Sequence, residues 1–245
     1  MLQNLSLEHI LFIDIETVPE FEEYEELSIV KQHLWDQKSK YKRNYEALNG
    51  KDISAAEYYH KAGIWAEFGK IICISVGYFN LSSQGRELRV KSFFGSNEKH
   101  LLKGFSQLLE TSFQHKSNLL CGHNVKEFDI PYIARRMLIN SLSLPKSLNL
   151  MGKKPWEVPH LDTLELWKFG DYKHFTSLKL LTEILGIPSP KDDIDGSQVR
   201  DVYYKTNDLK RIKAYCEKDV IAVAQVVLRL SHKTLLSENE ITSVD

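Results

Sequence analysis

The sequence predicts a mixed α/β fold, in which one sheet of about five strands is covered by helices on both faces. Short apolar runs rich in β-branched residues, typical of strands, occupy 10–17, 70–79 and 118–121. Longer stretches carry apolar residues at helical spacing, most clearly 97–113 and 208–232. Leading strands, followed by strands that alternate with helices, indicate a mixed sheet between layers of helices.

Composition limits the size and class of the protein. A chain of 245 residues, 42% hydrophobic and 27% charged, suits one large domain or one domain with an insertion. No apolar stretch approaches the roughly 20 residues of a membrane span, and no signal peptide is evident at the start. We therefore expect a soluble, cytoplasmic protein. Cys73, Cys121 and Cys216 form no C-x-x-C pair and are expected to be buried, reduced thiols.

Formal net charge is -1, so no bulk positive field draws this chain to polyanions. That balance counts against a protein that coats DNA without regard to sequence. It is compatible with an enzyme acting on nucleic acid, because bound cations can supply the positive charge where a phosphate must lie.

The first predicted strand runs from Ile10 to Thr17, and Pro19 is expected to end it. An acidic cluster follows, and apolar residues then recur at helical spacing, so we interpret residues 20–62 as a helical insertion. The insertion contains a basic group. This group is either a solvated helix face or a contact for nucleic acid, with Tyr41 and Tyr45 available for stacking. It comprises Lys38, Lys40, Lys42 and Arg43.

The remaining elements follow in order along the chain. Residues 70–79 and 87–94 are predicted to pair as an antiparallel hairpin around a Ser/Gly turn at 82–85. Ser96 or Asn97 can cap the next helix, and a short strand follows at 118–121.

The second half of the chain is predicted to be mainly helical. Helical spacing resumes from Glu127, and 160–164 is expected to be the last strand. Thr176 is expected to cap a further helix, which Gly186 ends. The final helix is expected from about Asp208 to His232.

Asp14 and Glu16 lie two residues apart in the first strand, so their side chains point to the same face of the sheet. Two like charges on a core strand repel each other and resist desolvation. A divalent metal would offset this cost. Alternatively, both carboxylates lie in water at the strand end.

Two other places supply carboxylates. Asp129 opens a helix just beyond a strand end, where α/β folds place ligands, although an acid there also complements the helix dipole. Tyr215 and Asp219 are four residues apart and share one face of the last helix, beside an apolar stripe. Taken alone, they could be a core aromatic and a surface acid.

Together, the three places resemble the exonuclease motifs of the DEDD superfamily. These motifs are Asp-x-Glu in a first strand, Asn-x-x-x-Phe-Asp at a strand-to-helix turn and Tyr-x-x-x-Asp in a late helix. Tyrosine in the third motif is similar to the DEDDy branch, which includes polymerase proofreading domains. The chain most resembles stand-alone bacterial exonucleases related to the family B polymerase proofreading domain, notably at 68–75, 185–191 and 195–199. The insertion and Lys126-Glu127 depart from that pattern.

The resemblance implies a ribonuclease H-like fold, with residues 1–245 forming a single exonuclease domain and an insertion at about 20–62. It also implies a metal-dependent 3′-to-5′ exonuclease that hydrolyses terminal phosphodiesters of single-stranded DNA with a free 3′ end and releases mononucleotides. Two Mg²⁺ or Mn²⁺ ions would be held by four carboxylates, which are those of Asp14, Glu16, Asp129 and Asp219. One ion would generate the nucleophile and the other would stabilise the leaving oxygen.

Further site residues also follow from the resemblance. Tyr215, with an ordinary pKa near 10, is a poor general base and would orient the attacking water. Thr17, Asn124 and Phe128 would face the terminal nucleotide, although Asn124 could be a turn residue and Phe128 a core residue. Asp162 is either a fifth acid near the site or the polar end of a strand, and we leave it out of the metal set.

Two alternatives remain beside the main hypothesis. The same chemistry could act on RNA or short oligonucleotides, because a contact to the 2′-hydroxyl leaves no clear trace in sequence. The chain could also be a catalytically silent module that binds nucleic acid. Buried like charges bring no advantage to a binder, so the complete set of acids argues against that reading. Protein partners cannot be inferred from the sequence.

Overall fold

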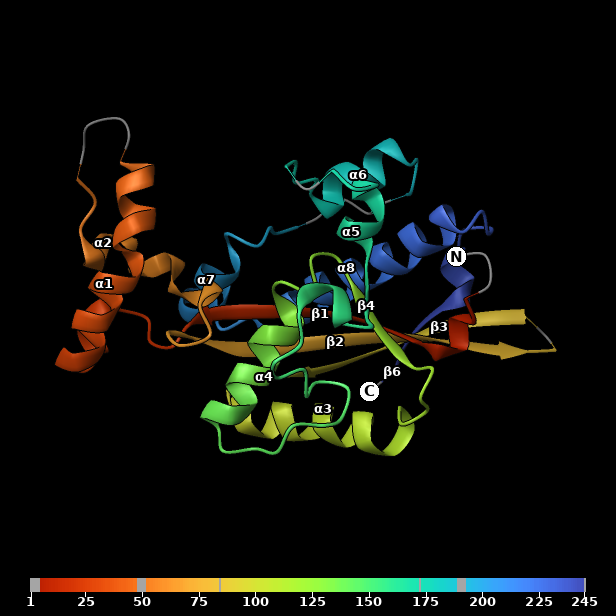
Figure 1. Cartoon of the computed structure of the whole chain (residues 1–245), viewed down its shortest axis with the longest axis horizontal. Helices are drawn as coiled ribbons and strands as arrows, with labels where there is room; N and C mark the ends of the chain where they lie inside the picture. The colour runs from red at the N-terminus through yellow and green to blue at the C-terminus, as the bar shows by residue number, and fades with distance from the viewer. Residues whose placement is uncertain (1–4, 48–51, 84, 172, 189–192, 245) are drawn as a thin grey trace.

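In the computed structural model, the described residues are 5–47, 52–83, 85–171, 173–188 and 193–244. Six strands form one mixed sheet in the order β5-β4-β1-β2-β3-β6 (Figure 1). β1 (Ile10–Pro19) lies inside this sheet and is buried along most of its length. A strand covered on both faces needs apolar side chains on both, which explains why its sequence is nearly continuously apolar.

The pairing of the strands brings three strand ends to one edge. β2 (Gly69–Ser82) pairs antiparallel with β1, and β3 (Gly85–Phe94) pairs antiparallel with β2. β4 (Leu119–Gly122) runs parallel to β1, and β5 (Leu161–Asp162) runs parallel to β4. The carboxyl ends of β1, β4 and β5 therefore lie at the same edge, where α/β folds place ligands.

Helices α3 (Glu98–Ser112) and α4 (Asp129–Ile139) cover one face of the sheet. Asn97 begins α3, because its side chain accepts the N–H of His100. Side chains of both helices share a core with Ile13 and Ile15 of β1. This packing assigns the odd-numbered residues of β1 to the α3/α4 face.

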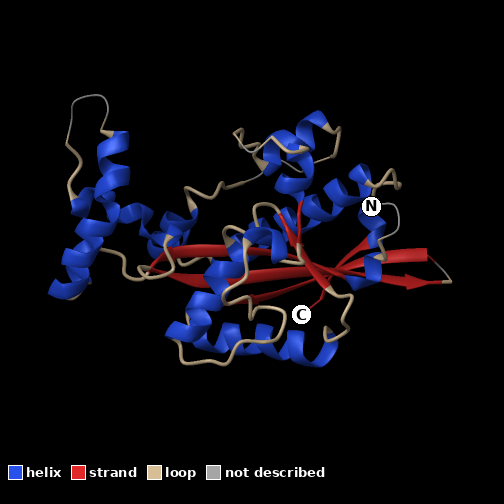
Figure 2. Cartoon of the chain, viewed as in Figure 1, coloured by secondary structure: helices blue, strands red, loops and turns tan. Residues whose placement is uncertain are grey.

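The long helix α8 (Leu209–Leu230) covers the opposite face, where Val220 and Val223 share a core with Phe12. Gly77 of β2 makes this close approach possible, since a Cβ there would lie 2.7 Å from Val220. Strands flanked by helices on both sides are clear in Figure 2. The predicted fold class, a mixed α/β sheet with helices on both faces, is confirmed.

Smaller helical elements lie between the larger ones along the chain. They are α5 (Thr163–Lys168), α6 (Leu178–Ile184), α7 (Val199–Asp201) and a π-helical turn at Val202–Thr206. Short 3₁₀ segments occur at Leu7–His9, Tyr24–Glu26, Tyr59–Ile64, Pro155–Glu157 and Glu238–Glu240.

The segment between β1 and β2 contains helices α1 (Ile29–Glu46) and α2 (Ala55–Tyr58). It has a small core of its own around Trp35, whose ring is fully buried and whose Nε1 donates to the Ala55 carbonyl at 2.8 Å. Removing such a buried aromatic side chain would cost about 3–5 kcal/mol. The single domain of residues 1–245 with an insertion at 20–62 remains a prediction.

Several elements differ from the expectation. β6 (Ile241–Val244) was not predicted, so the sheet has six strands rather than about five. Four residues along a sheet edge are too short for a clear periodic pattern. β1 also continues through Pro19, which pairs with Gly69. Ser177, not Thr176, caps α6, because its side chain accepts the N–H of Leu180.

Three further findings concern membrane crossing, the cysteines and the predicted features that the structure does not describe. Among the described residues, no helix combines the length and apolar character needed to cross a membrane. All three cysteines are buried free thiols, as expected. Some predicted features lie outside the described residues. These are Gln84 of the hairpin turn, residues 48–51 of the insertion, and Ser189, Pro190 and Lys191 of the stretch 185–191.

Candidate active site

β1 positions the first two carboxylates. Because Ile13 and Ile15 pack under α3 and α4, Asp14 and Glu16 point to the α8 side of the sheet. Glu16 is buried, with 8% of its surface exposed, and Asp14 is half-buried. The register with β2 shifts between Glu16 and Thr17, so a bulge ends the regular pairing just after the two acids.

The turn after β4 brings Asp129 to β1. Gly122 ends β4, and a Cβ there would lie 2.8 Å from the Ile13 carbonyl oxygen, so a side chain would push the turn away. Asn124 continues the turn with a φ of 63°, a left-handed conformation that asparagine tolerates. α4 then begins at Asp129, whose Oδ1 accepts the backbone N–H of Ile15 at 3.1 Å. This bond holds Asp129 next to the strand that carries Asp14 and Glu16.

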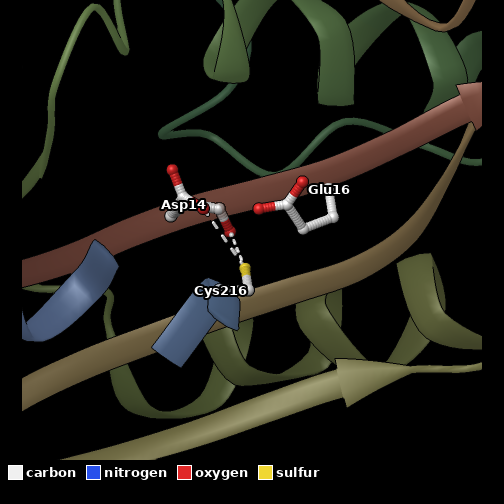
Figure 3. Close-up of side chains that lie close together, drawn as sticks. All are labelled: Asp14, Glu16 and Cys216. Atoms are coloured by element: carbon white, nitrogen blue, oxygen red, sulfur yellow. Dashed lines mark hydrogen bonds between the residues drawn. The ribbon is translucent and has the colours of Figure 1, made fainter. Parts of the chain in front are cut away.

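α8 supplies the third group of side chains. The Tyr215 hydroxyl hydrogen-bonds the Asp219 carboxylate, as their spacing of one helical turn allows. The buried Cys216 sulfur lies 3.3 Å from Asp14 Oδ2 and 3.4 Å from the Asp14 carbonyl oxygen. Figure 3 shows Cys216 of α8 next to Asp14, and Glu16 beside Asp14 on β1. Ligand atoms of Asp14, Glu16 and Cys216 lie within 4.8 Å of one another, a possible metal-binding cluster.

Burial and mutual repulsion raise the pKa values of these acids. The pKa of Asp14 is well above its ordinary value, first through burial and then through the charges of Asp219, Asp129 and Glu16. Burial, followed by the charge of Asp219, likewise raises the pKa of Glu16. Burial also raises the pKa of Asp129 to about 7, although Ile15 donates to it. Among the described residues, no lysine or arginine is a main influence on these three values.

Tyr215 and Cys216 are held in their protonated forms. Burial, then the charges of Asp219, Glu16 and Asp14, raise the pKa of Tyr215 far above its ordinary value of 10. Burial is also the first cause that raises the pKa of Cys216. At neutral pH both groups therefore carry a proton to donate, and neither is a base or a nucleophile.

Sequence reasoning missed the contact of Cys216 with Asp14 and left the place of Asp162 open. The Asp162 carboxylate accepts backbone N–H groups of Asn124 at 2.8 Å, Lys126 at 3.1 Å and Leu164 at 2.9 Å. It therefore holds the turn of the second motif in place. The signal for Cys216 was its position next to Tyr215 on the buried side of the helix, and for Asp162 its place at the end of β5.

The three predicted substrate residues lie close to these elements. The Thr17 hydroxyl donates to the Gly63 carbonyl at 2.8 Å, so it is already used within the protein. The Phe128 ring is partly buried against Tyr132, with ring centroids 5.4 Å apart. The Asn124 carbonyl oxygen accepts the N–H of Phe128 at 3.0 Å. Contact of these residues with a nucleotide remains a prediction.

A cleft opens beside Tyr215 and Asp219. Its volume is about 390 Å³, and its lining includes Tyr215 and Asp219 of α8 together with Lys179 and Thr182 of α6. A larger cavity of about 760 Å³ lies between the end of α3 and residues 145–160. None of the predicted site residues lines the larger cavity, so the smaller cleft is the one next to the candidate chemistry.

The chain is similar to known proteins in sequence and in fold. Residues 64–243 match a family model described as a predicted 3′-5′ exonuclease related to the exonuclease domain of PolB. This range contains Asp129, Tyr215 and Asp219 but not Asp14 or Glu16. No curated protein sequence matches the chain.

Among solved structures, the family B DNA polymerase of the archaeon Pyrobaculum calidifontis is similar in fold, with a TM-score of 0.49 and 13% identity. The similarity covers 94% of this chain and 27% of the polymerase. The chain thus spans about a quarter of the length of that polymerase.

Proposed function

The chain belongs to the family of predicted 3′-5′ exonucleases related to the exonuclease domain of PolB, and from this membership we propose that it degrades single-stranded DNA from a free 3′ end by a two-metal mechanism. The expected relation to the family B polymerase exonuclease domain is confirmed, and the chain is an enzyme with nuclease activity. The substrate, the ions and the roles of individual residues are our proposal.

Convergence of four carboxylates from three separate elements is the observation that supports the proposal most. Asp14 and Glu16 come from β1, Asp129 from the start of α4 and Asp219 from α8. The charges of Asp219, Asp129 and Glu16 all raise the pKa of Asp14, so the other three carboxylates lie close to that side chain. A protein that only binds nucleic acid would bear this repulsion without benefit, which disfavours a silent module.

Divalent cations fit this set of donors. Carboxylate oxygens are the ligands that Mg²⁺ and Mn²⁺ prefer, and Asp14, Glu16, Asp129 and Asp219 would hold the ions. When bound, the ions would neutralise the acids, activate the attacking water and stabilise the leaving 3′ oxygen. Cys216 would keep the Asp14 carboxylate in one orientation by donating its S–H to it.

Tyr215 would orient the attacking water. Its raised pKa keeps the hydroxyl protonated, so it cannot remove a proton from water at neutral pH. The hydroxyl donates to Asp219, and its oxygen can still accept a hydrogen bond from a water molecule. This pair of bonds would direct a water lone pair at the phosphorus atom of the terminal phosphodiester.

The terminal nucleotide would contact Thr17, Asn124 and Phe128, at the edge where β1 and β4 end. Because the Thr17 hydroxyl is bonded to Gly63, its methyl group is the part left for such a contact. RNA and short oligonucleotides are the alternative substrates. The test below therefore includes both polymers.

The test uses DNA and RNA strands of equal sequence, labelled at the 5′ end, incubated with Mg²⁺, with Mn²⁺ or with EDTA. We expect successive shortening from the 3′ end and release of mononucleotides, with DNA preferred and EDTA abolishing the reaction. The variant Asp129→Asn is the matched control for contaminating nucleases, because it keeps the acceptor for the Ile15 N–H and removes one charge.

Strands with a 3′ phosphate, and circular strands, complete the design. Both lack the free 3′ hydroxyl end and should be resistant. Equal degradation of a circular strand would overturn the exonuclease assignment, and a preference for RNA would correct the substrate alone.

A further inference from the structure

Helix α1 has a buried face and an exposed face of distinct character. The buried face carries Trp35 and Ser39, and Arg43 turns inward to donate to Ser39 Oγ and to the Ile53 carbonyl. An adjoining sector of the exposed surface carries five exposed residues, two of them tyrosines with 78% and 65% of their surface accessible. We call it the outer face of α1, formed by Leu34, Lys38, Tyr41, Lys42 and Tyr45.

Helical geometry gathers these side chains into one compact patch. At about 100° per residue, the five positions fall within a sector of roughly 100° around the helix axis. Tyr41 and Tyr45 are one turn apart, as are Lys38 and Lys42, so neighbouring side chains lie about 5–6 Å apart at their Cβ atoms. Lys40 points to a different side of the helix, outside the sector.

The charge of the patch is positive. α1 contains two carboxylates, Asp36 and Glu46, and each is already engaged, by Arg43 and by Lys61 respectively. Glu46 also accepts the Tyr58 hydroxyl. Within the described residues, neither Lys38 nor Lys42 forms an ion pair. The patch therefore stays cationic although the whole chain carries a formal charge of -1.

Exposed tyrosines between unpaired lysines suit one kind of occupant. Aromatic rings stack on the bases of a single strand, and lysines contact its phosphates. A second copy of the chain fits poorly, because a symmetric contact between two outer faces would bring lysines against lysines. Figure 1 places α1 beyond the carboxyl end of β1, away from the bulk of the molecule. It also lies outside the residues that match the exonuclease family, 64–243.

We propose that the outer face of α1 binds the single-stranded nucleic acid upstream of its 3′ end, by stacking of bases on Tyr41 and Tyr45 and by phosphate contacts of Lys38 and Lys42. This inference rests on the proposed exonuclease function. It assigns the helix a role in holding long strands, separate from the chemistry at the acids. It also revises the basic group recognised in the sequence, since Arg43 faces inward and Lys40 lies off the patch.

Binding is measured with the full chain in EDTA, by fluorescence anisotropy of a labelled oligo(dT) of about 20 nucleotides, longer than a typical single-strand site. Tyr41→Leu combined with Tyr45→Leu should weaken binding by roughly tenfold or more, and Tyr41→Phe with Tyr45→Phe should restore it. Lys38→Gln with Lys42→Gln should reduce the slope of log K against log salt by about 1.4, or about 0.7 for each lost phosphate contact. Lys40→Gln, an equal charge change per residue, is the matched control and should change the slope least.

A second measurement separates this inference from the proposed function. The leucine variants should cleave a trinucleotide at the wild-type rate, while their kcat/KM on the long strand falls roughly tenfold. Wild-type affinity for the long strand in the leucine variants would overturn the inference. A wild-type dimer that those variants convert to a monomer would overturn it too, by making the face a self-association surface. A wild-type chain that binds oligo(dT) through α1 but cleaves no strand would sink the exonuclease function alone.

Discussion

Replacing Asp129 by Asn should stabilise the metal-free protein at neutral and alkaline pH. The Asp129 carboxyl is buried beside like charges, and its pKa is raised from 3.8 to about 7. Asn keeps an oxygen to accept the Ile15 N–H and carries no charge. The substitution therefore removes the repulsion and retains the hydrogen bond.

The sign and size of the effect follow from linkage. Below about pH 4 the carboxyl is protonated in both the folded and the unfolded chain, so it contributes no pH dependence there. As pH rises from 3.8 to about 7, the unfolded chain ionises while the folded chain still holds the proton, and stability falls. At roughly 1.4 kcal/mol per pKa unit, this loss approaches about 4 kcal/mol at about pH 8. Structural relaxation and water entry reduce it, so we expect about 2–4 kcal/mol.

Thermal melts in EDTA across pH measure this directly. For a chain of this size, the variant should melt roughly 5–15 °C higher than wild type at about pH 8, and the two should converge near about pH 4. Glu240→Gln is a control of opposite sign, because Arg86 lowers the pKa of Glu240 to about 2. That variant should lose stability above about pH 4.

The claim that Asp129 destabilises the metal-free protein would be refuted if Asp129→Asn melted at or below the wild-type temperature at alkaline pH. The refutation requires that Glu240→Gln behave as stated. It would mean that the Asp129 carboxylate stabilises the metal-free fold. Added Mg²⁺ should reverse the order of the melts, since the wild-type site binds the ions more tightly.

Four further outcomes are expected. Asp14→Ala should abolish cleavage of a labelled strand while circular dichroism shows a folded protein, and a large drop in metal-free melting temperature would make Asp14 structural instead. Tyr215→Phe should lower the single-turnover rate about ten- to a thousandfold with KM nearly unchanged, and Asp219→Ala should lower the rate further. A Tyr215→Phe rate within about a factor of two of wild type would remove Tyr215 from the catalytic set. Cys216→Ala should weaken Mn²⁺ binding, followed by electron paramagnetic resonance, by about tenfold, and Cys216→Ser should restore it. Asp162→Ala should destabilise the fold by about 1–3 kcal/mol in urea melts, because it leaves backbone N–H groups of the second-motif turn without their acceptor.

Patterns of short range account for much of the fold and of the candidate site. The alternation of β1 assigns Asp14 and Glu16 to one face, and the helical repeat places Tyr215 and Asp219 one turn apart. Both relations depend only on backbone geometry over a few residues. For the same reason, short elements such as β6 escaped prediction, because four residues carry too little periodicity.

By itself, the sequence determined the fold class and supplied the acids and the tyrosine that we propose for the site. Only the tertiary structure decided which face of α1 is exposed, that Cys216 reaches Asp14 across 202 positions of the chain, and that Asp162 holds the turn at Asn124. The physical reason is the separation of the interacting residues along the chain. Spacing rules relate residues that are neighbours along a strand or helix, whereas contacts between elements depend on how whole helices pack on the sheet.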